Sequence, residues 1–136
     1  MLINTLKETI NTLNSLIELT LQDIENIKTA NHEKVFANTK PKEKLAEKFA
    51  NLKTEIDRQL SARNKPLQEL FSPEEEKLFE EFKEKLFAFN KEHKRFSKLA
   101  LSVANFYNAL LNQLKDESSI SYNNESFKNS KLQLKA

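Results

Sequence analysis

The chain has no glycine, no cysteine and no tryptophan, and only three prolines among its 136 residues. Glycine enters left-handed backbone conformations without a steric penalty, so its absence disfavours tight hairpin turns and phosphate-binding loops. Without cysteine the chain has no disulfide, no thiolate metal ligand and no cysteine nucleophile, which fits a reducing cytosol. These absences argue against disulfide-stabilised domains and glycine-rich nucleotide sites.

Long apolar runs are also absent. No hydrophobic segment approaches the roughly 20 residues that span a bilayer, so we expect no stable membrane insertion. The opening segment, MLINTLKETI, has no basic region and its apolar positions are interrupted by polar and acidic residues. We therefore expect no signal peptide and a cytoplasmic location.

Charge of neither sign dominates, since the chain has 22 Lys and Arg and 20 Asp and Glu. By position, residues 30–65 carry about +4, residues 66–85 about −4 and residues 86–115 about +4. Because these blocks alternate along the chain and do not form one basic face, we expect no nucleic-acid partner.

The residues that are present favour helices, because the chain is rich in Lys, Glu and Leu. Over residues 2–28, apolar side chains recur in alternating steps of three and four, the heptad pattern of a helix with a narrow packing seam. This seam consists of Ile3, Leu6, Ile10, Leu13, Ile17, Thr20, Ile24 and Ile27. We expect a first helix over 2–28 that packs along one or two neighbours.

A second helix is expected over residues 31–62. Asn31 is its expected N-cap, because the side-chain oxygen can accept a hydrogen bond from a free backbone N–H of the first turn. Pro41 lacks a backbone donor and clashes with the preceding turn, so it predicts either a kink or a helix that begins near residue 41. The expected apolar face consists of Val35, Leu45, Phe49, Leu52, Ile56 and Leu60.

A third helix is expected over residues 73–115, roughly 60 Å long at 1.5 Å per residue. Ser72 and Glu75 form a Ser-x-x-Glu capping box at its start. The apolar arc covers roughly 100° in the first half of this helix and roughly 160° in the second half. Part of the wider arc is therefore expected to lack a partner within the chain. Phe87 lies opposite the main stripe and is interpreted as a lone exposed aromatic or the edge of a second contact surface.

Together these segments predict an all-α fold: an elongated three-helix antiparallel hairpin or bundle with a very long third helix and a flexible C-terminal tail. Residues 1–116 are expected to form a single helical domain. Residues 117–136 are polar and cannot bury much surface alone, so we expect them to be disordered or to become ordered on binding.

Few residues suggest chemistry. His32 and His93 stand alone, without a second ligand at the spacing of a helical metal site. The sequence also lacks a glycine-rich phosphate loop and nucleophile motifs such as Ser-x-x-Lys and Gly-x-Ser-x-Gly. We therefore expect no enzymatic activity, no catalytic residue, no metal and no cofactor.

Three groups of residues form a pattern along nearly the whole chain. The turn and the second expected helix contribute Asn31, Val35, Thr39, Lys42 and Leu45. The third expected helix contributes Phe89, Asn90, Phe96, Phe106, Leu110 and Leu114, and Tyr122 follows it. This arrangement resembles the FlgN-type family of flagellar export chaperones. The chain departs from the family pattern in three places: Asn31 stands where an acid is usual, His93 stands where Asn is usual, and no Gly follows Tyr122.

The resemblance implies a cytosolic chaperone of the flagellar type III export system. Its partners would be hook–filament junction proteins of the FlgK and FlgL type, whose premature association it would prevent and which it would deliver to the export gate. In this family the C-terminal part captures the substrate, and the tail tyrosine, here Tyr122, is implicated in docking to the export-gate protein FlhA.

The residue pattern is compatible with this function, because an amphipathic helix of a substrate protein can lie against a surplus apolar helix face. The candidate substrate-binding residues are Val103, Phe106, Tyr107, Leu110, Leu111 and Leu114. The alternatives are a homo-oligomeric coiled-coil structural or adaptor protein, for which the same stripe would close a homodimer, and another type III secretion chaperone.

Overall fold

The computed structural model describes residues 1–118 and contains three α-helices and one short 3-10 turn, with no strand among these residues. The helices are α1 (Leu2–Lys28), α2 (His32–Arg63) and α3 (Pro73–Ser118), and η1 (Leu67–Glu69) lies in the connection before α3. The prediction of an all-α fold with three helices is confirmed. The 3-10 turn was not predicted.

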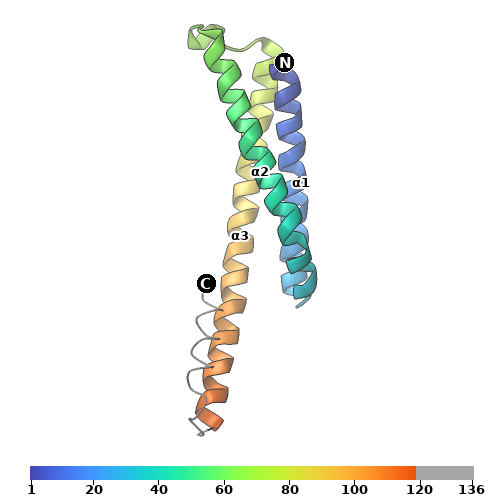
Figure 1. The fold of residues 1–136 in the computed structure, drawn as a ribbon, viewed down its shortest axis with the longest axis vertical. Helices are drawn as coiled ribbons and strands as arrows, with labels where there is room; N and C mark the ends of the chain where they lie inside the picture. Colours follow the sequence, from blue (N-terminus) through green and yellow to red (C-terminus); the bar gives the residue numbers. More distant parts are fainter. Residues whose placement is uncertain (119–136) are drawn as a thin grey trace. The chain divides into compact units, whose positions relative to one another are not determined.

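The chain divides into two compact units, residues 1–96 and residues 97–136. The first unit holds α1, α2, η1 and the beginning of α3, and in it α2 runs antiparallel to both α1 and the first part of α3 (Figure 1). The rest of α3 belongs to the second unit. The single domain expected over 1–116 stays a prediction, and the tail expected over 117–136 falls almost entirely outside the described residues.

The core of the first unit is built mainly from α1. Ile10, Leu13 and Leu16 pack with Phe82 of α3, and Leu2 and Leu6 pack with Ile56 of α2. Because α1 contacts both other helices, it buries a wide face. The predicted narrow seam is therefore wrong in part. Three of its residues, Ile3, Ile17 and Ile27, are only half-buried, whereas Leu2 and Leu16, which were not assigned to it, are fully buried. Each fully buried leucine contributes roughly 1.5–3 kcal/mol of hydrophobic stabilisation.

Three threonines are buried within the same face of α1. The hydroxyls of Thr9, Thr12 and Thr20 each donate a hydrogen bond to the backbone carbonyl four residues earlier, at 2.7, 2.9 and 2.7 Å. A buried hydroxyl without a partner would destabilise the fold, so these local bonds let polar side chains occupy the helix interface.

The turn between α1 and α2 is closed by backbone hydrogen bonds. The N–H of Ala30 donates to the carbonyl of Ile27 at 3.1 Å, and the N–H of Asn31 donates to that of Asn26 at 2.7 Å. This is the pattern of a Schellman cap, in which Ala30 adopts a left-handed φ of 59°. Asn31 occupies the N-cap of α2, but its side chain makes no capping hydrogen bond, so the predicted side-chain cap is wrong.

Pro41 lies within α2, and no new helix begins there. The predicted alternative of a helix beginning near residue 41 is therefore wrong. Asn38 and Lys42, on either side of the proline, both donate hydrogen bonds to Asp23 of α1 at 2.9 Å. These bonds tie the first turns of α2 to α1 and help hold residues 32–42 in the helix despite the missing donor.

The start of α3 confirms the predicted capping box. The backbone N–H of Ser72 donates to Oε1 of Glu75 at 2.9 Å, and the N–H of Glu75 donates to Oγ of Ser72 at 3.2 Å. The sequence did not predict that Arg63, at the end of α2, bonds both carboxylate oxygens of Glu75 and the carbonyl of Leu70. Arg63 therefore fixes the connection between α2 and α3.

Candidate partner-binding surface

The candidate substrate-binding residues lie on one side of α3 in the second unit. At 100° per residue they fall within about 140° of the helix circumference. We call this surface the 103–114 face, and it consists of Val103, Phe106, Tyr107, Leu110, Leu111 and Leu114.

Most of the 103–114 face is open to solvent. Phe106 is 64% exposed and Leu114 is 51% exposed, while Tyr107 and Leu110 are 40% and 41% exposed. Val103 and Leu111 are half-buried. Large apolar side chains gathered on one exposed face are typical of a surface that binds another molecule.

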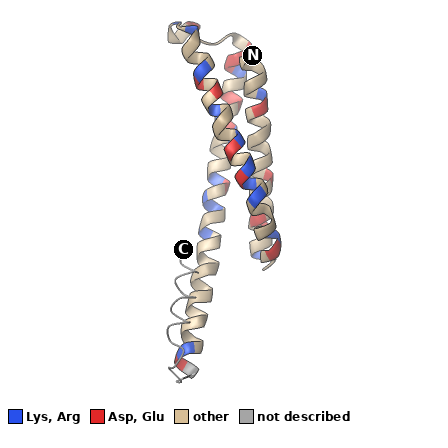
Figure 2. Ribbon diagram, viewed as in Figure 1, with Lys and Arg blue, Asp and Glu red and all other residues tan. Residues whose placement is uncertain are grey.

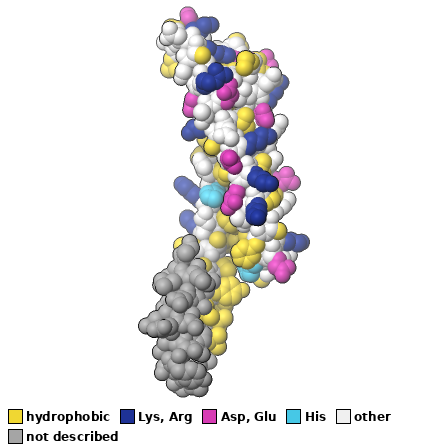
Figure 3. Space-filling view, viewed as in Figure 1, with side chains coloured by type: hydrophobic (Ala, Val, Ile, Leu, Met, Phe, Trp, Pro, Cys, Tyr) yellow, Lys and Arg dark blue, Asp and Glu magenta, His cyan; other side chains and the backbone are white. Residues whose placement is uncertain are grey.

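The surroundings of this face are uncharged. Residues 99–114 contain no Lys, Arg, Asp or Glu, and this part of α3 is uniformly tan in Figure 2. Figure 3 shows hydrophobic side chains gathered along the same part of the helix. Within residues 1–118, however, no helix has the length and apolar character needed to cross a membrane.

Tyr122, the residue that the resemblance assigns to export-gate docking, lies outside the described residues. Its role stays a prediction.

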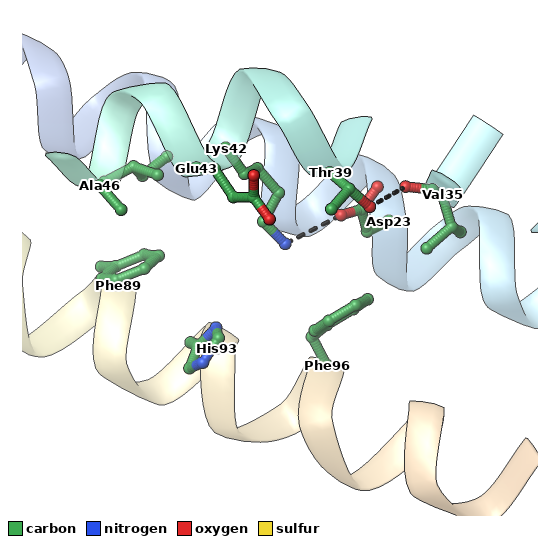
Figure 4. Close-up of a pocket in the computed structure, with 10 residues that line it drawn as sticks. Asp23, Val35, Thr39, Lys42, Glu43, Ala46, Phe89, His93 and Phe96 are labelled. Carbon is green, nitrogen blue, oxygen red and sulfur yellow. Dashed lines mark hydrogen bonds and ion pairs between the residues drawn. The ribbon is translucent and has the colours of Figure 1, made fainter. Parts of the chain in front are cut away.

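A separate feature in the first unit is a pocket of about 270 Å³ between α1, α2 and the beginning of α3. Figure 4 shows Ala46 of α2 opposite Phe89 of α3, with Lys42 directed from α2 toward α3. Glu43, Ala46 and His93 are exposed, so the pocket opens to solvent. Its lining residues are Leu16, Asp23, Val35, Thr39, Lys42, Glu43, Ala46, Phe89, His93 and Phe96.

One wall of this pocket carries a buried ion pair that was not predicted from the sequence. Asp23 is 1% exposed, and its Oδ2 accepts a hydrogen bond from Nζ of Lys42 at 2.9 Å. The same ammonium lies 4.1 Å from the centroid of the Phe96 ring, within cation–π range. One signal could have revealed this pair: Asp23 follows Thr20 by three residues and Leu16 by seven, which places it on the buried face of α1.

The described residues offer little for catalysis or metal binding. No group of three or more His, Asp or Glu side chains within residues 1–118 could hold a metal ion. His93 lies between two phenylalanine rings, with ring centroids 5.6 Å from Phe89 and 6.4 Å from Phe96. A histidine in these surroundings packs against apolar rings, and within residues 1–118 no carboxylate is hydrogen-bonded to it as in a catalytic base.

Comparisons with protein-family models, with curated proteins and with solved structures find no match to this chain.

Proposed function

We propose that this chain is a cytosolic, non-enzymatic export chaperone of the flagellar type III system that binds hook–filament junction proteins. The observation that carries the proposal is the 103–114 face, where large apolar side chains lie open to solvent on an uncharged stretch of helix. Burying such side chains against a partner removes apolar surface from water, at about 25 cal/mol for each Å².

The shape of this surface suits a helical partner. A helix offers a long, nearly straight row of side chains, and an amphipathic helix can lay its own apolar row along it. The family resemblance supplies the partner: a terminal segment of a junction protein of the FlgK or FlgL type. Covering that segment would prevent premature association, and release at the export gate would complete the cycle.

The polar tail would carry the second contact. Tyr122 stands where the resembled family has its tail tyrosine, and we propose that it docks to the export-gate protein FlhA. Tyrosine suits this role because it brings a large contact area and a hydroxyl with few rotatable bonds.

The test is the mass of the full chain in light scattering, measured alone and with the C-terminal region of a candidate junction protein. A 1:1 complex is expected, and Phe106→Asp or Leu110→Asp should abolish it by placing a charge on the apolar face. Phe87→Asp is the matched control, because Phe87 is 74% exposed but lies outside the 103–114 face.

Two outcomes would count against the proposal. One is a stable homodimer that ignores the candidate and is dissociated by Phe106→Asp, which favours the coiled-coil scaffold. The other is a complex that Phe87→Asp weakens as much as Phe106→Asp does.

A further inference from the structure

The outward side of α2 in the first unit carries a row of exposed residues that packing within the chain does not explain. Phe36, Lys40, Glu43 and Glu47 follow one another at steps of four, three and four, which places them on one side of the helix. We call this row the α2 stripe. Phe36 is 76% exposed, a large apolar side chain in solvent.

The α2 stripe runs beside the pocket between α2 and α3. Glu43 belongs to both, since it is a member of the stripe and lines the pocket. At the end of the pocket away from Val35, Ala46 faces the ring of Phe89 (Figure 4). One surface of the first unit therefore presents both a protruding aromatic side chain and an open apolar pocket.

Charges on the stripe match when α2 is paired with an antiparallel copy of itself. If the two-fold axis passes between Pro41 and Lys42, Lys40 of each copy lies opposite Glu43 of the other. Within residues 1–118 neither Lys40 nor Glu43 has an ion-pair partner, so both are free to pair across such an interface. The two-fold axis produces this opposite-charge pair twice.

The same register brings Phe36 to the pocket. Phe36 of one copy then lies opposite Glu47 of the other, one residue along α2 from Ala46 at the pocket end formed by Ala46 and Phe89. The pocket lining there is apolar, and aromatic side chains that fill desolvated pockets are enriched at interface cores. The register that pairs Lys40 with Glu43 thus also places Phe36 next to the pocket.

We propose that a second copy of this chain docks antiparallel on α2, with Phe36 of each copy seated in the pocket of the other. The occupant is a second copy because one surface supplies both anchor and pocket, and because its charges complement themselves under a two-fold axis. The contact is small, so the dimer is weak and concentration-dependent. It is distinct from the 103–114 face and does not depend on the proposed export function.

The test is sedimentation velocity of the full chain from low micromolar to about 0.5 mM, a range that covers weak dimers. The weight-average mass should rise toward that of a dimer. Phe36→Asp should weaken dimerisation by about tenfold or more, as expected for an interface anchor. Phe87→Asp, the same change at another exposed phenylalanine, should leave it unchanged.

Charge reversal tests the register. Lys40→Glu should weaken the dimer by placing Glu opposite Glu, and the double variant Lys40→Glu/Glu43→Lys should restore it, because the exchange recreates both pairs. Circular dichroism of each variant establishes that the helices are intact.

Three results would overturn the proposal: a chain that stays monomeric throughout the range, a dimer indifferent to Phe36→Asp, or a double exchange that fails to restore association. Phe106→Asp separates this dimer from the proposed function. That variant should lose the junction-protein segment and keep the α2 dimer, so either proposal can fail alone.

Discussion

Lys42 of α2 donates a hydrogen bond of 2.9 Å to Asp23 of α1, and this ion pair lies in the interface of the first unit. Asp23 is 1% exposed, and its other oxygen accepts a hydrogen bond from the side-chain amide of Asn38. The Lys42 ammonium also lies over the ring of Phe96 in α3. One buried carboxylate thus organises contacts among three helices at the level of the pocket.

Removing one member of this ion pair should destabilise the fold, because the other charged side chain is left without its partner in a poorly hydrated site. We expect Asp23→Ala to lower the free energy of unfolding by about 3 kcal/mol, the lower end of the range for breaking a buried ion pair. Urea denaturation measures the change. Asp23→Leu combined with Lys42→Met should recover much of the loss, since apolar replacements of both partners leave no buried charge.

The surface pair Glu8–Lys48 is the matched control for Asp23. Its atoms lie 3.3 Å apart and both side chains are about half exposed, so Glu8→Ala should cost about 0–1 kcal/mol. Equal losses of unfolding free energy for Asp23→Ala and Glu8→Ala would show that burial does not make the Asp23–Lys42 pair more stabilising than a surface pair.

Lowering the pH should remove the stabilisation that the Glu75 carboxylate provides at the start of α3. The hydrogen bonds from Arg63 lower the pKa of Glu75 to about 2 from its ordinary value of 4.5, and the backbone N–H of Ser72 acts in the same direction. A carboxyl whose pKa is lower in the folded state stabilises the fold fully above its unfolded pKa. That stabilisation is lost as the pH falls from about 4.5 toward 2.

Glu75→Gln should therefore destabilise the fold at pH 7 by about 2–3 kcal/mol and flatten the pH dependence below pH 4.5. Guanidinium unfolding at a series of pH values measures both effects. Glu55 provides a comparison, because hydrogen bonds from Arg58 and Gln59 also lower its pKa to about 2, but this pair lies on the surface, where solvent weakens it, so Glu55→Gln should flatten the acid limb less. If Glu75→Gln left the acid limb unchanged, the assignment to the α3 cap would be wrong.

The difference between Ser72 and Arg63 shows what the sequence could reveal. Ser72 and Glu75 are three residues apart, and their capping box depends only on local helix geometry, so it was predictable. Arg63 reaches the same carboxylate across the connection from α2. Nothing in its neighbours along the chain marks that contact, which exists only because the helices are packed.

The buried face of α1 was predicted in outline but not in width. The heptad pattern predicted a narrow seam along one or two neighbours, whereas α1, which packs against two helices, buries Leu2, Leu16 and Asp23 as well. At the candidate surface, the pattern predicted that apolar side chains would remain exposed, and Phe106 and Leu114 are exposed. Under the proposed function their partner belongs to another molecule, which neither the sequence nor the structure of one chain determines.

The turn after α1 leads to a prediction for stability: the same change, Ala→Gly, should stabilise the protein at residue 30 and destabilise it inside a helix. Ala30 holds a left-handed φ of 59°, a conformation that penalises any side chain with a Cβ. Ala30→Gly should therefore stabilise the protein by about 0.5–1 kcal/mol, after allowance for the greater freedom of glycine in the unfolded chain. Ala50→Gly, at an exposed position inside α2, should destabilise it by about 1 kcal/mol.

Thermal unfolding followed by circular dichroism distinguishes the two glycine variants. The midpoint should rise for Ala30→Gly and fall for Ala50→Gly. A lower midpoint for both would mean that the Schellman cap does not form in solution.

The 103–114 face should tolerate changes that the core cannot. Phe106→Asp should alter the free energy of unfolding by no more than about 0.5 kcal/mol, because its side chain is 64% exposed and buries little surface in the free chain. Leu13→Ala, at a fully buried position in the α1 core, should cost about 2–5 kcal/mol through lost burial and the cavity it leaves. Urea unfolding of both variants tests this contrast. A large loss for Phe106→Asp would mean that the free protein already buries this face, and the surplus apolar surface would then belong to folding and not to a partner.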